Sequence, residues 1–213
     1  DCPELKRVVS GGEVCSLSLA KKIPPNVDFY NKYGPTEATI SVTEHKFDPK
    51  LDNALVLPIG RPIAHMEVYI LNGKNEICPI GVPGELCISG IGLSSGYLNN
   101  EELTKQKFSK HPLKKDALIY KTGDTANWLP DGNIQFISRM DNQVKIRGHR
   151  IELGEIESSL FKLPQIKNCA VLAQKDNQKN DTLVGYLVLE ASASIGSVKN
   201  DLKESLPEYM IPA

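Results

Sequence analysis

Residues 141–157 constrain the fold of this chain more than any other stretch. In the sequence DNQVKIRGHRIELGEIE, the apolar residues Val144, Ile146 and Ile151 alternate with cationic side chains. Such alternation predicts a half-buried β-hairpin with a basic outer face. Gly148 supplies a turn position between the two arms, because glycine adopts a positive φ at little energetic cost. Glutamates then precede apolar residues at helical spacing, so the hairpin is expected to lead directly into an amphipathic helix.

The chain before this stretch changes character near residue 56. Leu5–Ser10 and Val27–Tyr30 are apolar runs typical of buried strands, with the pattern of a short helix near Ser16–Lys22 between them. Beyond residue 56, short strand-like runs are separated by turn residues. These runs are Glu67–Leu71, Gly84–Ser89, Ala117–Lys121 and Asn133–Ile137. They predict a β-rich, barrel-like subdomain over residues 56–140.

After residue 140 the expected order is hairpin, helix, strand, strand and helix. The strand-like runs are Lys167–Gln174 and Thr182–Leu189, and apolar residues from Ile195 to Leu206 recur at helical spacing. About seventy residues are enough for a small domain of modest stability. The predicted fold class is therefore α/β for the first part, with the barrel-like subdomain, followed by a small α+β subdomain over residues 141–213.

Composition excludes several classes of protein. The net charge is -1 and charges of both signs are interspersed, so neither nucleic acid nor an anionic membrane is expected as a partner. No apolar run approaches the ~20 residues that span a bilayer. The first residues lack the apolar core of a signal peptide, and the chain does not begin with Met. We expect a cytoplasmic protein and a segment of a longer chain.

The cysteines give no sign of a disulfide framework. There are five, dispersed and without a Cys-x-x-Cys pair, which is typical of reduced thiols. The four histidines show no metal-ligand spacing either. We predict that all five cysteines are structural or incidental, and they are Cys2, Cys15, Cys78, Cys87 and Cys169.

Two short segments carry residue types suited to nucleotide chemistry. Tyr33–Glu37 offers an aromatic ring, a tight turn, a hydroxyl and a carboxylate. An aromatic ring can stack on a purine, a hydroxyl can donate to a phosphate oxygen, and a carboxylate can hold Mg²⁺. Thr122-Gly123-Asp124 adds a carboxylate able to accept both hydroxyls of a ribose. Each segment alone also fits an ordinary turn.

These segments occur with others in a definite order. The ordered set is 31–37 (NKYGPTE), 84–90 (GELCISG), 120–124 (YKTGD), 141–157 and 206–212 (LPEYMIP). In order and spacing it closely resembles the later core motifs of amino-acid adenylation domains from nonribosomal peptide synthetases, which belong to the superfamily of acyl-adenylate-forming, AMP-binding enzymes. The resemblance covers nearly the whole chain.

The resemblance implies an activity and a division of the chain. The implied enzyme joins an amino acid to AMP from ATP with Mg²⁺, releases pyrophosphate, and passes the acyl group to the phosphopantetheine thiol of a peptidyl carrier domain. Residues 1–140 would be the end of a large AMP-binding core, and residues 141–213 a mobile C-terminal subdomain. Neighbouring synthetase domains would be further partners.

The resemblance also assigns residues to the nucleotide. Tyr33, followed by Gly34, would pack on the adenine, Thr36 would contact the α-phosphate and Glu37 would hold the metal. Asp124 would bind the ribose. The remaining nucleotide-binding residues would be Gly12, Glu13 and Asn31 bordering the adenine, Phe136 on the other side of the nucleotide where many members have Tyr, and Arg139 near the ribose and phosphate.

Three residues of the second part receive roles in the same way. Asp141 occupies the position of the family hinge, about which the C-terminal subdomain changes orientation between the two half-reactions. Lys145 and Gly148 belong to the loop that enters the active site during the thioester step, where Gly148 would give a thiol arm backbone clearance. Lys145 as a solvated strand residue is the alternative.

The positions that match the family's amino-acid pocket are mostly small or apolar. Lys32 is the exception, and a buried ammonium is costly unless it finds an anion. One hypothesis is therefore an acidic or strongly polar substrate side chain, aspartate-like first. The alternative is that Lys32 points outward and other residues set specificity. The matching positions are Val9, Gly11, Lys32, Ile40 and Ser41.

The glycine-rich run at 90–96 superficially suggests a dinucleotide fingerprint. It has one residue too many between its last glycines and no convincing strand–helix setting, so that interpretation is rejected. The run instead matches the family's Gly-rich motif, although Ser94-Ser95 replace the Ala-Arg of many members. That departure weakens any role for a basic residue there.

Other family parts are not found in these 213 residues. We find no upstream phosphate loop, no aspartate for the substrate amino group and no segment with the catalytic lysine. We therefore expect the segment alone to be inactive. Alternatives are an acyl- or aryl-CoA ligase of the same superfamily, which usually departs from the 143–157 run after the glycine, and a non-catalytic module that docks a carrier protein.

Overall fold

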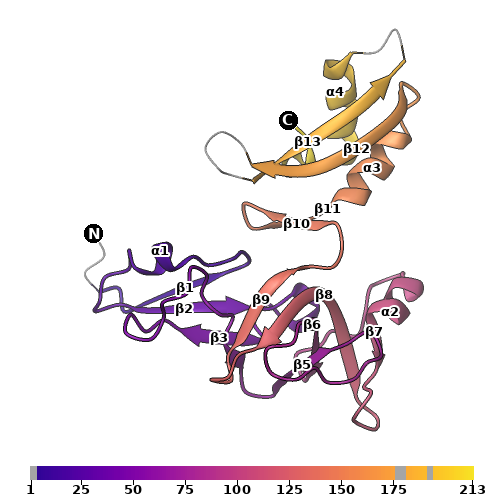
Figure 1. Ribbon diagram of the computed structural model, residues 1–213. Coiled ribbons are helices and arrows are strands. Elements are labelled where there is room, and N and C mark those ends of the chain that lie inside the picture. Colours follow the sequence, from indigo (N-terminus) through magenta and orange to yellow (C-terminus); the bar gives the residue numbers. More distant parts are fainter. Residues whose placement is uncertain (1–3, 176–180, 191–193) are drawn as a thin grey trace. The chain divides into compact units, whose positions relative to one another are not determined.

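The computed structural model describes residues 4–175, 181–190 and 194–213, and Figure 1 shows their helices and strands. They form two compact units, Asp1–Asp141 (unit 1) and Asn142–Ala213 (unit 2). Each unit has its own apolar core. The assignment of these units to an adenylation core and a mobile subdomain stays a prediction.

Unit 1 begins with a mixed four-stranded sheet. Its order is β1 (Arg7–Gly11), β2 (Asp28–Tyr33), β3 (Thr43–Lys46) and β4 (Arg61–Pro62). β1 and β2 are parallel and joined through α1 (Leu17–Ala20), whereas the other pairs are antiparallel. Since parallel strands end at the same edge of a sheet, the loops after β1 and β2 leave that edge together.

The two faces of this sheet differ because side chains alternate along each strand. Phe29, Asn31 and Tyr33 on β2 are buried. Tyr30 and Lys32 occupy the other face, where the Arg7 guanidinium lies 4.8 Å from the centre of the Tyr30 ring. One face therefore contributes to the core and the other carries cations over an aromatic ring.

The second sheet of unit 1 is open in the described residues. Its path is β5 (Met66–Leu71), β6 (Gly84–Gly90), β8 (Leu118–Trp128) and β7 (Phe108–Lys110), and β9 (Ile134–Arg139) also pairs with β8. α2 (Glu101–Lys107) precedes β7 and is capped by the Asn100 side chain. The β-rich subdomain is thus a five-stranded sheet without barrel closure among these residues.

Strand β8 is longer than the sequence pattern predicts. The expected strand ends at Lys121, whereas β8 continues to Trp128. The expected strand end at Lys121 is therefore wrong, and Asp124, expected in a turn-like segment after it, lies inside β8 opposite Arg139. Gly123 has a φ of +73°, and the register shifts between Thr125 and Ala126. These irregularities give the segment turn-like residues within a strand.

Unit 2 confirms the predicted hairpin and helix. β10 (Gln143–Ile146) pairs antiparallel with β11 (His149–Glu152), and α3 (Leu153–Phe161) follows at once. The two-residue loop has a positive φ at both Arg147 (51°) and Gly148 (79°), as a type I′ turn requires. The remaining elements are β12 (Ile166–Lys175), β13 (Asp181–Leu189), α4 (Ile195–Ser205) and the 3₁₀ turn η2 (Glu208–Met210).

The core of unit 2 is built from apolar side chains, with Gln143 as a buried polar residue of the same unit. Ile151, Ile156 and Leu160 are at most 1% exposed and pack with Val198 and Leu202 of α4. Fully burying one such side chain contributes roughly 1.5–3 kcal/mol relative to exposure. Packing between α3, α4 and the strands therefore stabilises unit 2.

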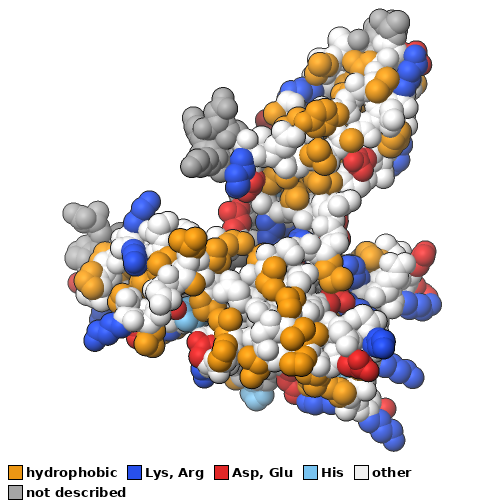
Figure 2. Space-filling view, in the orientation of Figure 1, with side chains coloured by type: hydrophobic (Ala, Val, Ile, Leu, Met, Phe, Trp, Pro, Cys, Tyr) orange, Lys and Arg blue, Asp and Glu red, His pale blue; other side chains and the backbone are white. Residues whose placement is uncertain are grey.

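The surface and the thiols fit the composition. Figure 2 shows basic and acidic side chains interspersed on the visible face, without a broad field of one sign. Cys15, Cys78, Cys87 and Cys169 are free thiols, and Cys2 lies outside the described residues. Within the described part of the chain, no helix is long and apolar enough to cross a membrane.

Candidate functional site

The loop after β2 holds its residues in a strained, closely packed turn. A Cβ atom on Gly34 would lie 2.5 Å from the carbonyl oxygen of Ile40, so only glycine fits there. Thr39 and Ile40 have φ values of 57° and 69°, which is a rare conformation for β-branched residues. The bond from the Val42 amide to the Tyr33 carbonyl (2.8 Å) closes the loop. Strain of this kind clusters at functional sites.

The loop presents Thr36 and Glu37 differently. Both belong to the 3₁₀ turn η1 (Thr36–Ala38), where Thr36 is exposed and Glu37 is only 8% exposed. The Tyr97 hydroxyl donates to Glu37 Oε1 at 2.6 Å. The structure therefore offers a hydroxyl at the surface beside a carboxylate whose orientation is fixed.

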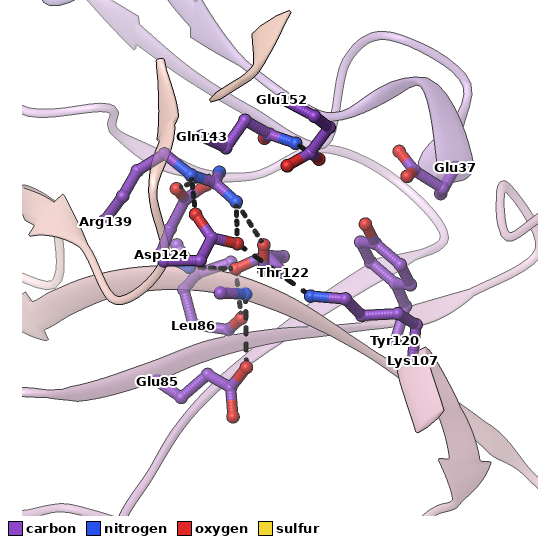
Figure 3. Close-up of polar contacts among 12 residues, drawn as sticks. Glu37, Glu85, Leu86, Lys107, Tyr120, Thr122, Asp124, Arg139, Gln143 and Glu152 are labelled. Carbon is purple, nitrogen blue, oxygen red and sulfur yellow. Dashed lines mark hydrogen bonds and ion pairs between the residues drawn. The ribbon is translucent and has the colours of Figure 1, made fainter. Parts of the chain in front are cut away.

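A buried polar network lies across β2, β8 and β9. The Tyr33 hydroxyl donates to Asp124 Oδ2 at 2.5 Å, and Arg139 Nη1 donates to Asp124 Oδ1 at 2.6 Å. Figure 3 shows the Arg139 guanidinium facing the Asp124 carboxylate beside Thr122. Asp124 is 3% exposed. Both of its oxygens thus accept hydrogen bonds from within unit 1.

Arg139 also binds the residue at the end of unit 1. Its Nε and Nη2 atoms each donate to an Asp141 carboxylate oxygen at 2.7 Å, the bidentate geometry in which Arg–carboxylate pairs are strongest. Gly123 makes room for this pair, because a Cβ there would lie 2.8 Å from Asp141 Oδ2. One guanidinium therefore joins the predicted ribose ligand, Asp124, to the predicted hinge residue, Asp141.

The network changes the acidity of Tyr33. Burial raises the pKa of the Tyr33 phenol well above its usual range, and the neighbouring Asp124 carboxylate raises that pKa further. The phenol stays protonated and keeps donating to Asp124. Tyr33 packs in the core of unit 1 and is 7% exposed.

The other predicted nucleotide residues lie on β2 and β9 and in the loop after β1. Asn31 is buried, and its Nδ2 donates to the Pro58 carbonyl at 2.8 Å. Gly12 has a φ of +88° and no atom within 4 Å of the position a Cβ would take, and Glu13 is exposed. Phe136 is half-buried against the same core as Tyr33. The loops after β1 and β2 thus lie at one sheet edge.

Three of the predicted pocket residues, Val9, Gly11 and Lys32, lie on strands of the first sheet, whereas Ile40 and Ser41 lie in the loop between β2 and β3. Gly11 pairs with Lys32, and Val9 pairs with Tyr30, so these positions share one face. Val9 is 52% exposed and Ile40 is 79% exposed, and Ser41 is half-buried beside it. Lys32 Nζ lies 3.2 Å from Glu44 Oε2, with a third of its side chain exposed. The ammonium therefore already has an anion within this chain.

The remaining predicted residues belong to unit 2. Lys145 lies on β10 opposite Arg150 and is half-buried. Gly148 is exposed, with open space around the position that a Cβ would occupy. The His149 ring stacks on Tyr209, with ring centres 4.0 Å apart and an angle of 8° between the planes. The Gln143 amide donates to Glu152 at the base of the hairpin.

Sequence reasoning missed Tyr97. The residue directly follows the glycine-rich run at 90–96, and no periodicity indicates a partner sixty positions away. Its position immediately after Gly96 is the only sequence signal, because glycine-rich turns often bring a following side chain close to another backbone.

Comparisons with known proteins cover almost the whole chain. A family model described as AMP-binding enzyme matches residues 1–98, and one described as AMP-binding enzyme C-terminal domain matches residues 155–213. Bacitracin synthase 1 from Bacillus licheniformis is 46% identical over 217 residues, covering 100% of this chain. The chain spans only 4% of that relative's length.

Two solved structures show the same fold. The adenylation domain AlmE from Vibrio cholerae, in complex with glycyl-adenosine-5'-phosphate, superposes with a TM-score of 0.86 at 28% identity, covering 99% of this chain and 41% of that one. An artificially fused adenylation–PCP di-domain NRPS from Klebsiella oxytoca gives a TM-score of 0.84 at 27% identity, covering 97% and 39%.

Proposed function

Because this chain belongs to the family of AMP-binding enzymes, we propose that it is a segment of an amino-acid adenylation domain in a nonribosomal peptide synthetase. The longer protein converts an amino acid and ATP to aminoacyl-AMP and pyrophosphate. It then loads the acyl group onto the phosphopantetheine thiol of a peptidyl carrier domain. The observation that carries the proposal is the juxtaposition of an exposed Thr36 and an oriented Glu37 with the Tyr33–Asp124–Arg139 network.

In the adenylation step the protein contributes the orientation of the reactants and the stabilisation of developing charge. A substrate carboxylate oxygen forms a bond to the α-phosphorus of ATP while the bond from that phosphorus to the pyrophosphate oxygen breaks. The pyrophosphate leaves with the electron pair. Thr36, exposed on η1, donates a hydrogen bond to the α-phosphate in this proposal. Donors placed where charge develops are the main source of such catalysis.

The residues present fit a magnesium ion held together with ATP. Glu37 is the candidate carboxylate here, and no group of three or more potential metal-ligating residues occurs in the described residues. Mg²⁺ is usually held by one or two carboxylates plus substrate phosphates, so a single oriented glutamate suffices. When bound, the ion neutralises charge on the phosphates.

Nucleotide binding requires a rearrangement around Asp124. Its two oxygens accept hydrogen bonds from Tyr33 and Arg139, and it is 3% exposed. In the proposed function the ribose hydroxyls reach this carboxylate when the Arg139 side chain moves aside towards the phosphate. Tyr33 and Phe136 then border the adenine, together with Asn31 and the 11–13 loop.

The second half-reaction is assigned to unit 2. The carrier thiol loses its proton and attacks the carbonyl carbon of the aminoacyl-AMP. The C–S bond forms, the bond from that carbon to the phosphate oxygen breaks, and AMP leaves with the electron pair. Lys145 and Gly148 on the β10–β11 hairpin serve this step, and Asp141 is the hinge between the half-reactions. The open space around Gly148 supports its role as the clearance for a thiol arm.

The test is amino-acid-dependent exchange between ATP and labelled pyrophosphate. The longer protein is assayed against a panel of amino, aryl and fatty acids. Exchange with one amino acid is the expected result. Exchange with aryl or fatty acids alone would place the protein with the CoA ligases, and no exchange from a folded protein would favour the carrier-docking module.

The chemical class of the substrate side chain is a separate hypothesis within the proposed function. An acidic or strongly polar side chain stays a hypothesis, and it depends on Lys32 exchanging Glu44 (3.2 Å) for the substrate. Lys32→Ala should then change the ranking of acidic against apolar amino acids in the exchange assay. An unchanged ranking would assign Lys32 to the surface ion pair alone.

A further inference from the structure

The glycine-rich run at 90–96 lies directly against the η1 turn. Thr39 Oγ1 donates to the Gly92 carbonyl at 2.8 Å, and the Ser94 amide donates to the Glu37 carbonyl at 2.8 Å. A Cβ on Gly92 would lie 2.8 Å from the Met66 sulfur. Each segment therefore donates one hydrogen bond to a backbone carbonyl of the other, and the lack of a side chain at Gly92 lets the run pack against Met66 of β5.

Tyr97 directly follows this run, and its side chain contacts the Glu37 side chain. Its hydroxyl donates to Glu37 Oε1 at 2.6 Å, a length typical of a strong bond to an ionised carboxylate. Burial raises the pKa of the Tyr97 phenol, and its bond to Glu37 raises that pKa further. In this bond the Tyr97 hydroxyl is the donor and the Glu37 carboxylate the acceptor.

Tyr97 is itself firmly placed. Its ring packs edge-to-face with Phe108 at 5.8 Å between centres, and its amide donates to Thr104 Oγ1 at 2.9 Å. Gly96, with a φ of +129°, allows this approach, since a Cβ there would lie 2.5 Å from a Thr104 methyl group. A donor fixed at ring and backbone can restrict a carboxylate to one orientation.

We propose that Tyr97, presented by the glycine-rich run, is a positioning residue for the metal-binding carboxylate of Glu37. This inference rests on the proposed function of Glu37. The hydroxyl holds one oxygen of Glu37 and so keeps the carboxylate in one orientation, in which its remaining lone pairs would bind the metal. Hydrogen bonds behind a metal ligand commonly account for 10–100-fold in metal affinity.

The test compares Tyr97→Phe with wild type in the longer synthetase proposed above. Phenylalanine keeps the ring contact with Phe108 and removes only the hydroxyl. Binding of Mn²⁺ in the presence of α,β-methylene ATP is followed by electron paramagnetic resonance, and AMP binding without metal is followed by calorimetry. We expect about tenfold weaker Mn²⁺ binding, unchanged AMP binding, and a matching rise in the Mg²⁺ concentration that half-saturates pyrophosphate exchange.

Tyr69→Phe is the matched control. The Tyr69 hydroxyl also donates to a glutamate, Glu67 Oε2, at 2.8 Å, but on β5 and outside the candidate site. Its loss should leave Mn²⁺ binding unchanged. Tyr97→Phe should also have no further effect on Mn²⁺ binding once Glu37 is replaced by Gln, because the two residues act through one carboxylate.

The outcomes separate this inference from the proposed function. Equal Mn²⁺ affinity in wild type and Tyr97→Phe overturns the positioning role alone. A parallel loss of AMP binding in Tyr97→Phe also overturns it, because the hydroxyl would then act on the whole nucleotide site and not on the metal ligand alone. A folded wild type that binds no Mn²⁺ with the nucleotide analogue overturns both proposals.

Discussion

Units 1 and 2 hold their candidate site residues in different ways. In unit 1, Asp124 and Glu37 are 3% and 8% exposed, and each accepts a hydrogen bond from a tyrosine of the same core. In unit 2, Gly148 sits at the tip of a two-residue turn above an apolar core. Buried polar groups are costly unless satisfied, so the site of unit 1 is part of what stabilises it.

This difference between the units predicts which substitutions change both binding and stability and which change binding alone. In unit 1, replacing Asp124 removes the acceptor for both Tyr33 and Arg139, so binding and folding should fail together there. In unit 2 the turn can change while the core of α3, α4, β12 and β13 stays intact. The predictions below can be tested by hydrogen exchange, which reports on each unit separately in one chain.

The largest effect is expected from Asp124→Ala. The change removes the acceptor of the buried Tyr33 hydroxyl and one of the two carboxylates bound to Arg139. The free energy of unfolding of unit 1 should fall by about 3 kcal/mol, the lower end of the range for breaking a buried ion pair. The lower end is expected because Arg139 still has its second carboxylate partner, Asp141. Hydrogen exchange should show the loss in β8 and β9 and no change in unit 2.

Asp181→Ala is the control for this prediction. Its ion pair with Lys175 belongs to unit 2 and is half-exposed, so its loss should cost less than about 1 kcal/mol. If Asp124→Ala cost unit 1 no more stability than Asp181→Ala costs unit 2, the Tyr33–Asp124–Arg139 network would not stabilise unit 1.

The second effect is alkaline destabilisation of unit 1. The pKa of Tyr33 is raised by burial and by Asp124. Below about pH 10, the pKa of tyrosine in an unfolded chain, Tyr33 is neutral in both states and contributes fully. Above it the unfolded state releases a proton that the folded state keeps, so stability falls by about 1.4 kcal/mol per pH unit.

Unit 2 should respond less steeply above pH 10. Its tyrosines, Tyr186 and Tyr209, are half-exposed, and among its described residues the group with a raised pKa is the partly buried Cys169. The contrast is tested by measuring the free energy of unfolding with denaturant at pH values from 8 to 11.5, with hydrogen exchange assigning the change to each unit. Tyr33→Phe should reduce the slope of unit 1 by about 1.4 kcal/mol per pH unit, and equal slopes in both units would contradict the assignment.

The sequence predicted unit 2 well because its signals are local. The alternation around Val144 and Ile151 and the helical spacing from Leu153 are read within one element at a time, and both predictions are confirmed. In unit 1, β8 was predicted too short because Thr122-Gly123-Asp124 has the composition of a turn, and its pairing with β6 and β9 overrides that preference.

The partners within the candidate site could not be predicted. Tyr33 and Asp124 are 91 positions apart, and Tyr97 and Glu37 are 60 apart. No pattern along the chain indicates which hydroxyl meets which carboxylate, since tertiary packing alone decides it. The glycines were the nearest signals, because Gly34, Gly96 and Gly123 occur where a Cβ would collide with another segment.

The third prediction concerns Gly148→Ala. Its φ of +79° costs a non-glycine residue about 1 kcal/mol, and the space around it is open, so the cost comes from the backbone alone. Hydrogen exchange should show a loss of about that size in β10 and β11. In the longer protein, acyl transfer to the carrier should slow by about tenfold or more, with pyrophosphate exchange unchanged.

Gly154→Ala is the matched control, since Gly154 lies in α3 with open space at its Cβ position. Its φ is not positive, so alanine should be neutral or slightly stabilising there. Equal slowing of acyl transfer by both variants would remove the special role of Gly148.

The smallest effect is expected from His149→Ala. The His149 and Tyr209 rings stack at 4.0 Å and join the hairpin to η2. A pair of partly exposed rings stacked face to face should contribute about 0.5 kcal/mol, the low end for aromatic pairs. Hydrogen exchange should therefore speed up at β10, β11 and η2 and stay unchanged in α3, whose buried residues face the core.

A double-mutant cycle with Tyr209→Leu separates the stack from other effects. If the rings act together, the double variant loses no more than either single variant. This result would mean that the stack itself supplies the contribution of about 0.5 kcal/mol, from an exposed contact and not from a buried bond such as that between Tyr33 and Asp124. Additive losses would instead show that each ring packs on its own segment and that the turn residues alone set the hairpin orientation.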